Sequence, residues 1–176
     1  YYGPRLPKWV QKFNKKDLCE TYLSQKWELL LNSKLYDESL VDNSVYEEAF
    51  DGEKYPKFPH DLPKLLEENG KGLIKSTPFG NSLTKDLAIA AIEGERLGED
   101  EFTDLLAVSF SSTDYVGHQF GADSKETQDT YLRLDRDLEV FLSYLDARVG
   151  KENVLVFLTA DHGAVRTPAY LSDRNI

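Results

Sequence analysis

Two short segments of the chain combine a carboxylate with an imidazole. Asp114 and His118 are four residues apart in the first, and Asp161 and His162 are adjacent in the second. Together they contain two of the three histidines of the chain. Carboxylate oxygen and imidazole nitrogen suit zinc, manganese or iron better than calcium. We interpret the two pairs as partial ligand sets for two neighbouring metal ions, of the kind that binds a phosphoryl group.

Each pair follows an apolar run that predicts a buried strand. Residues 105–110 (LLAVSF) and 154–158 (VLVFL) are short and almost continuously apolar, which is typical of strands covered on both faces. Between them, Asp123 and Glu126 form a capping box and Gly150 a stop signal, which predicts one long helix. The side chains expected on its inner face are Tyr131, Leu134, Leu138, Phe141, Leu145 and Val149. Its charged side chains are expected to face solvent: Arg133, Asp135, Arg136, Asp137 and Glu139.

A strand, a helix and a second strand in this order predict a right-handed parallel unit. Because open parallel sheets bind ligands beyond the carboxyl ends of their strands, Asp114 and Asp161 should meet at one edge. Taken singly, each Asp is better explained by turn chemistry, and each His by an ordinary loop position. The matched placement of both pairs favours the metal site. Residues 111–113 (SST) are expected to form capping or turn hydrogen bonds rather than to act as a nucleophile.

These motifs resemble those of the alkaline phosphatase superfamily. The pattern Asp-x-x-Gly-His-x-x-Gly occupies residues 114–121, and an Asp-His-Gly triplet begins 43 residues after His118. Residues 76–81 (STPFGN) are also similar to those of the bacterial phosphate-irrepressible alkaline phosphatases and the related type I phosphodiesterase/nucleotide pyrophosphatase group. The resemblance extends from about Pro56 to Ala164.

The resemblance implies an α/β fold with a mostly parallel sheet flanked by helices, incomplete in this chain. It implies that Asp114 and His118 bind one zinc ion and that Asp161 and His162 bind a second. It further implies a Thr or Ser nucleophile upstream of Tyr1, which attacks phosphorus in a double displacement. We therefore expect an internal fragment of a phosphoric monoester hydrolase that is inactive on its own. A phosphodiesterase and a non-catalytic binding domain with the same fold remain as alternatives.

The amino-terminal region lies outside the part of the chain that resembles the family. Residues 1–57 are interpreted as a cap or insert with one helix at 15–31, and residues 58–176 as the central part of the α/β domain. Residues 1–14 and 33–57 are expected to be irregular. Further helices are predicted after Asp61, ending at Gly70, and at residues 81–97. His60 is expected to be an ordinary, solvated loop histidine.

The acidic composition of the chain argues against several kinds of binding partner. The chain has 176 residues, 40% of them hydrophobic, and a net charge of −10. Such acidity argues against nucleic acid and against an acidic membrane surface, and no apolar run approaches the length of a transmembrane helix. The single cysteine, Cys19, excludes an internal disulfide. The expected partner is a small phosphate ester, and the resemblance implies a periplasmic or secreted protein; the oligomeric state stays open.

Overall fold

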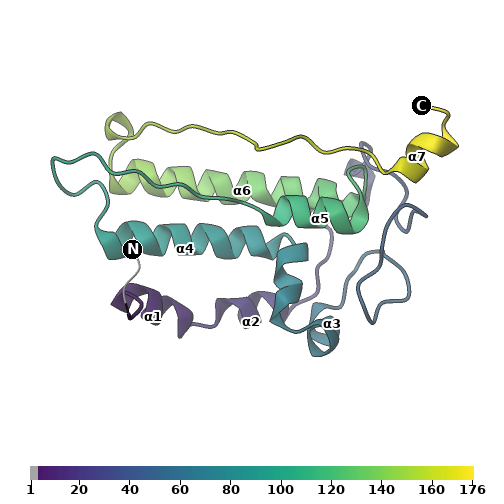
Figure 1. Cartoon of the computed structure of the whole chain (residues 1–176), viewed down its shortest axis with the longest axis horizontal. Helices are drawn as coiled ribbons and strands as arrows, with labels where there is room; N and C mark the ends of the chain where they lie inside the picture. The colour runs from purple at the N-terminus through teal and green to yellow at the C-terminus, as the bar shows by residue number, and fades with distance from the viewer. Residues whose placement is uncertain (1–3) are drawn as a thin grey trace.

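The computed structural model describes residues 4–176, and in this part of the chain helices are joined by long irregular or extended segments (Figure 1). The α-helices are α1 (Lys8–Asn14), α2 (Leu18–Leu23), α3 (Leu62–Asn69), α4 (Phe79–Glu95), α5 (Ser112–Phe120), α6 (Lys125–Arg148) and α7 (Pro168–Asp173). Three short 3₁₀ helices complete the set: η1 (Ser33–Leu35), η2 (Lys71–Ser76) and η3 (Lys151–Asn153).

The predicted parallel sheet is not confirmed. Residues 105–110 and 154–158 run extended and in the same direction, from the end of α6 toward α5 (Figure 1), but neither pairs with a neighbour. Within residues 4–176 the only β pairing is an isolated bridge between Trp27 and His60. A strand needs a ladder of hydrogen bonds to a neighbour. Most apolar side chains of both runs are consequently exposed, including Leu105 at 93% and Phe157 at 83%, whereas Val108 packs against α4 and α6.

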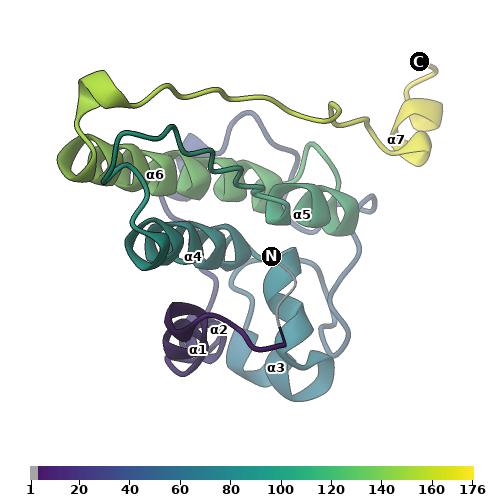
Figure 2. The ribbon, with the colours of Figure 1, turned by 60° about the vertical axis from the view of Figure 1, so that its left-hand side comes forward.

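Helices α4 and α6 lie side by side and point in the same direction, and the two extended runs return the chain across them (Figure 2). A small apolar cluster joins the two helices and consists of Ala88, Ile92 and Phe141. The arrangement therefore has the chain course of a strand–helix–strand unit, with the helical layer packed and the strands unpaired.

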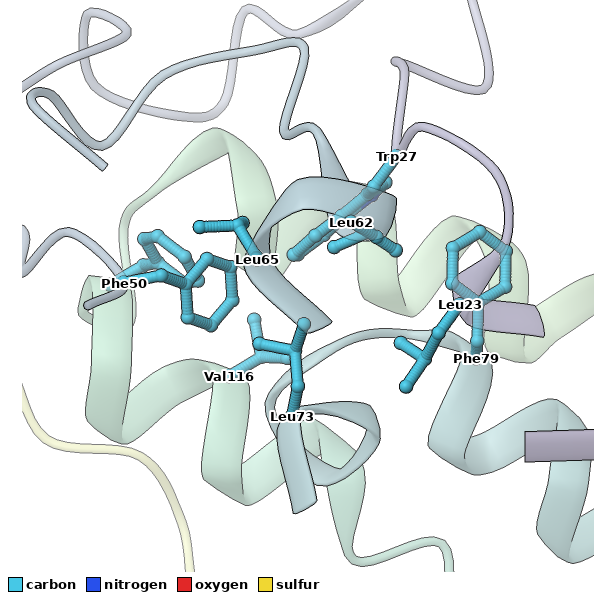
Figure 3. Packing of buried hydrophobic residues seen from close by; sticks show 9 residues of the cluster. Leu23, Trp27, Phe50, Leu62, Leu65, Leu73, Phe79 and Val116 are labelled. Atoms are coloured by element: carbon cyan, nitrogen blue, oxygen red, sulfur yellow. The ribbon is translucent and has the colours of Figure 1, made fainter. Parts of the chain in front are cut away.

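The main core lies where α2, α3, η2, α4 and α5 meet (Figure 3). Its buried residues are Leu23, Trp27, Phe50, Leu62, Leu65, Leu73, Phe79, Val116 and Phe120. Residues on both sides of position 57 contribute to it, so that the amino-terminal region packs against the rest of the chain. The division into residues 1–57 and 58–176 stays a prediction.

The amino-terminal helix prediction was wrong in its boundaries. Residues 15–31 do not form one helix: α1 precedes this range, and α2 occupies only six residues of it. Asp17 interrupts the helical path with a left-handed backbone (φ 45°), and Trp27 pairs with His60. Residues 4–14 are accordingly not irregular throughout, whereas residues 1–3 lie outside the described part. The expected irregular stretch at 33–57 is confirmed apart from η1.

The longer helices agree with the sequence to within two residues, but their caps differ. Ser124, not Asp123, caps α6 by accepting the backbone N–H of Thr127 at 3.1 Å, and Asp61 makes no side-chain cap on α3. Tyr131, expected to face inward, is 54% exposed.

One residue assigned to the solvated face of α6 is buried. Asp137 is only 9% exposed and accepts hydrogen bonds from Ser82 (2.7 Å) and Lys85 (2.9 Å). Both donors lie on α4, which covers this side of α6. Asp137 was wrongly predicted to face solvent because the amphipathic pattern of one helix does not show which other element will cover it.

Candidate metal site

The two predicted pairs lie together. His162 Nε2 is 3.7 Å from Asp114 Oδ1, and His118 Nε2 is 3.5 Å from Asp114 Oδ2. Within the second pair, His162 Nε2 is 3.8 Å from Asp161 Oδ2. Asp114 is therefore the central group, with an imidazole at each of its oxygens.

Helix α5 positions the first pair. Asp114 and His118 are i and i+4 on one face, and a carboxylate in the first turn is favoured by the positive end of the helix dipole. Val116 and Phe120 occupy the opposite face and are fully buried in the main core. Figure 3 shows Val116 pointing from α5 toward Leu73 and Leu65. Burial of that face directs both candidate ligands outward.

The second pair lies in the exposed segment that follows residues 154–158. The Nδ1 atom of His162 is hydrogen-bonded to the carbonyl of Gly163 (3.1 Å), which leaves Nε2 directed at Asp114. This carbonyl, together with Asp161 and Asp114, raises the pKa of the imidazole above its usual value. Downstream, Arg166 is paired with Asp123 at 2.7 Å, which ties the segment to the loop between α5 and α6.

The donor set fits a transition-metal ion in its chemistry. A histidine whose Nδ1–H is bound to a carbonyl presents a free Nε2 lone pair, as zinc-ligating histidines do. All four side chains are open to solvent, from 46% exposed for Asp114 to 93% for Asp161. Over residues 4–176, however, no group of three or more His, Cys, Asp or Glu is arranged to hold a metal ion. The role of these four residues as metal ligands therefore stays a prediction.

The hydroxyl groups before Asp114 make hydrogen bonds to other side chains. Ser109 and Ser111 are bonded to each other at 2.7 Å, and Thr113 accepts a hydrogen bond from Asn81 at 2.9 Å. The predicted capping bond is not formed, because Ser111 makes no side-chain cap on α5, and the hydrogen-bond partner of Thr113 lies on α4, 32 residues away in the sequence.

The sequence missed a buried charged cluster behind α5. His60, expected in solvent, is 0% exposed; its Nδ1 is 2.9 Å from Glu53 and its Nε2 is 3.2 Å from Glu126. Burial by itself lowers the pKa of this imidazole, but the hydrogen bonds to the two glutamates outweigh burial and raise the pKa to about 9. Its ring packs 5.3 Å from that of Phe120. Glu126 is 66 residues from His60 in the sequence, so that no local pattern indicates their contact.

A second buried carboxylate joins the amino-terminal region to α6. Asp129 is 0% exposed and accepts hydrogen bonds from Trp27 Nε1 (2.7 Å), Leu30 N–H (2.7 Å), the hydroxyl of Tyr36 and Arg133 Nε (2.6 Å). Four donors explain why a charge is tolerated there.

Comparison with known proteins identifies the family to which this fold and these Asp/His motifs belong. Residues 7–176 match the family described as type I phosphodiesterase / nucleotide pyrophosphatase. The chain belongs to this family.

Individual relatives agree with this assignment. A Myroides odoratus protein named calcium-transporting ATPase is 54% identical over 99% of this chain and 32% of its own length. Alkaline phosphatase PafA of Elizabethkingia meningoseptica is 50% identical over 97% of this chain and 31% of its own length. Alkaline phosphatase PhoV of Synechococcus elongatus is 49% identical over 99% and 32%. The chain thus spans about a third of the length of these relatives.

A solved structure confirms the fold relationship. The crystal structure of wild-type alkaline phosphatase PafA superimposes with a TM-score of 0.95 at 48% identity, over 100% of this chain and 34% of that one. This chain therefore has the fold of the corresponding part of PafA. Over the described residues, none of the helices is both long and apolar enough to span a membrane.

Proposed function

We propose that this chain is the metal-binding part of a phosphoric monoester hydrolase of the alkaline phosphatase type. The observation that carries the proposal is the approach of His162 to Asp114 at 3.7 Å, which joins two motifs from distant parts of the chain. The family assignment and the names of the relatives PafA and PhoV support it. The substrate we propose is a small phosphate ester, since the net charge of −10 disfavours nucleic acid.

Asp114 and His118 would hold one zinc ion, and Asp161 and His162 a second. Two such ions supply positive charge at the oxygens of the transferring phosphoryl group, where electrostatic stabilisation is most effective. The chain's own contribution is orientation. Asp114 lies between both imidazoles, and the carbonyl of Gly163 fixes the ring of His162 with Nε2 toward the site.

The remaining parts of the active site are proposed to lie outside these 176 residues. With two protein ligands per metal, each site lacks at least one ligand of the usual three. A Thr or Ser nucleophile would come from the same missing region, as would strands that pair with residues 105–110 and 154–158. The exposed apolar side chains of both extended runs support this, because such surface is normally covered. On its own, the chain should be inactive and should bind zinc weakly.

Two other functions keep the same four residues. A phosphodiesterase or nucleotide pyrophosphatase is favoured by the family description itself and would differ in the substrate pocket. A non-catalytic binding domain would lack the nucleophile. By analogy with its relatives we propose a periplasmic or secreted location.

Hydrolysis of p-nitrophenyl phosphate and of its bis-ester by the complete protein, with zinc supplied, separates these functions. We expect faster release from the monoester, and loss of this activity in Asp114→Asn. Asp146→Asn, on the exposed face of α6, is the matched control and should retain activity. Faster diester release would move the protein to the phosphodiesterase group. If zinc binds but neither ester is hydrolysed, the non-catalytic binding domain is the remaining function.

A further inference from the structure

Asn81 links the start of α4 to the start of α5. Its side chain is 1% exposed, and its Nδ2 donates a hydrogen bond to Oγ1 of Thr113 at 2.9 Å. Thr113 immediately precedes Asp114, the central group of the candidate metal site. Among residues 4–176, Oδ1 of Asn81 has no hydrogen-bond partner although it is buried, and the bond to Thr113 is the only hydrogen bond that this side-chain amide makes there. A buried amide with one satisfied contact is costly, and simple packing does not explain it.

The neighbouring residue shows how closely the two helices approach. A Cβ atom on Gly80 would lie 2.0 Å from Oγ of Ser112 and 2.7 Å from the carbonyl oxygen of Ile74. Only glycine allows this contact, because real Cβ atoms do not come so near. The first turns of α4 and α5 are therefore in direct contact at residues 80–81 and 112–113.

Within the described part of the chain, no apolar side chain of the first turn of α5, residues 112–115, is buried. The buried apolar residues of α5, Val116 and Phe120, lie in its middle and at its end. Its N-cap, Ser111, makes no side-chain cap hydrogen bond. Helix ends without caps fray readily. The contacts at Gly80 and Asn81 thus fix the turn that carries Asp114.

We propose that Asn81 is a positioning residue, which through Thr113 keeps the carboxylate of Asp114 between the imidazoles of His118 and His162. This inference rests on the proposed function, because the carboxylate matters only if the site binds metal. Asn81 does not touch the metal or substrate in this scheme. Asn81 increases metal affinity by holding the backbone at Asp114 in place.

The test measures zinc affinity of the complete protein by competition with a chromogenic chelator, alongside thermal unfolding of the metal-free protein. Asn81→Leu and Thr113→Val are close in size to the native residues and each remove one partner. We expect each to weaken zinc binding at one site roughly tenfold, as loss of an outer partner of a ligand does. The double variant should be no weaker than either single one. Thr113→Ser, which keeps the hydroxyl, should restore most of the affinity.

Thr84→Val is the matched control, since the Thr84 hydroxyl donates its hydrogen bond within α4, to the carbonyl of Gly80. It should leave zinc affinity unchanged. Wild-type zinc affinity in Asn81→Leu, or in Thr113→Val if the first variant does not fold, would overturn the inference while the proposed function stands. Absence of zinc binding and of phosphate-ester hydrolysis in the wild-type protein would overturn both.

Discussion

The buried cluster around His60 should make the chain less stable as the pH becomes alkaline. The folded state raises the pKa of His60 from 6.5 to about 9, so that folding favours the protonated imidazole. The resulting stabilisation is fully present below pH 6.5 and is lost as the pH rises through about 9. At 1.36 kcal/mol per pKa unit, the shift corresponds to about 3 kcal/mol. This is a large share of the stability of an ordinary domain.

A second group acts in the same direction. Burial, followed by the nearby charge of Glu126, raises the pKa of Glu47 to about 8. A carboxyl group with a raised pKa also favours the protonated folded state, and its stabilisation is lost as the pH rises through about 8. Above both values the region would contain the charged carboxylate of Glu47 and a neutral imidazole at His60. The two effects therefore reinforce each other.

Urea unfolding at pH values from 6 to 10 measures this dependence. Trp27, whose ring lies 5.0 Å from that of His60, provides a fluorescence signal from the cluster. We expect the free energy of unfolding to fall between about pH 6.5 and 9 and to level off above pH 9. His60→Gln should be less stable at pH 6 and should lose most of the slope, whereas Glu47→Gln should keep the part due to His60. A flat profile in the wild type, or the same slope in His60→Gln, would refute the reasoning.

Three further outcomes are expected. Asp129→Asn should lower the free energy of unfolding by about 3 kcal/mol, because four donors lose a buried carboxylate; a change below 1 kcal/mol would contradict this. Arg166→Gln should leave the free energy of unfolding almost unchanged, since solvent screens the exposed guanidinium in its pair with Asp123; a clear loss of stability in the same urea titration would contradict this. Asp161→Asn in the complete protein should abolish hydrolysis and reduce bound zinc, measured by atomic absorption; full activity with unchanged zinc would remove Asp161 from the site.

The sequence predicted the elements that depend on local patterns. The long apolar and polar periodicities located α4 and α6, and glycine marked the end of α3. The joint placement of two Asp/His pairs after apolar runs predicted that they would meet, and the distance between Asp114 and His162 agrees with this. Their role as metal ligands stays a prediction.

Features that depend on distant partners could not be predicted. His60 looked like a solvated loop residue because Glu126, its partner, was read as a helix cap. Asp137 looked exposed because the covering helix α4 is far away in the sequence. The two predicted strands are not formed although their composition is typical of strands. A strand must pair with a neighbour, and residues 4–176 do not supply one.

The most direct test of the central claim is a crystal structure of the complete protein with zinc, with anomalous diffraction recorded at the zinc edge. The account predicts two zinc peaks, one bound by Asp114 and His118 and the other by Asp161 and His162. Zinc bound elsewhere, or no peak at these four residues in a protein that hydrolyses phosphate esters, would contradict it.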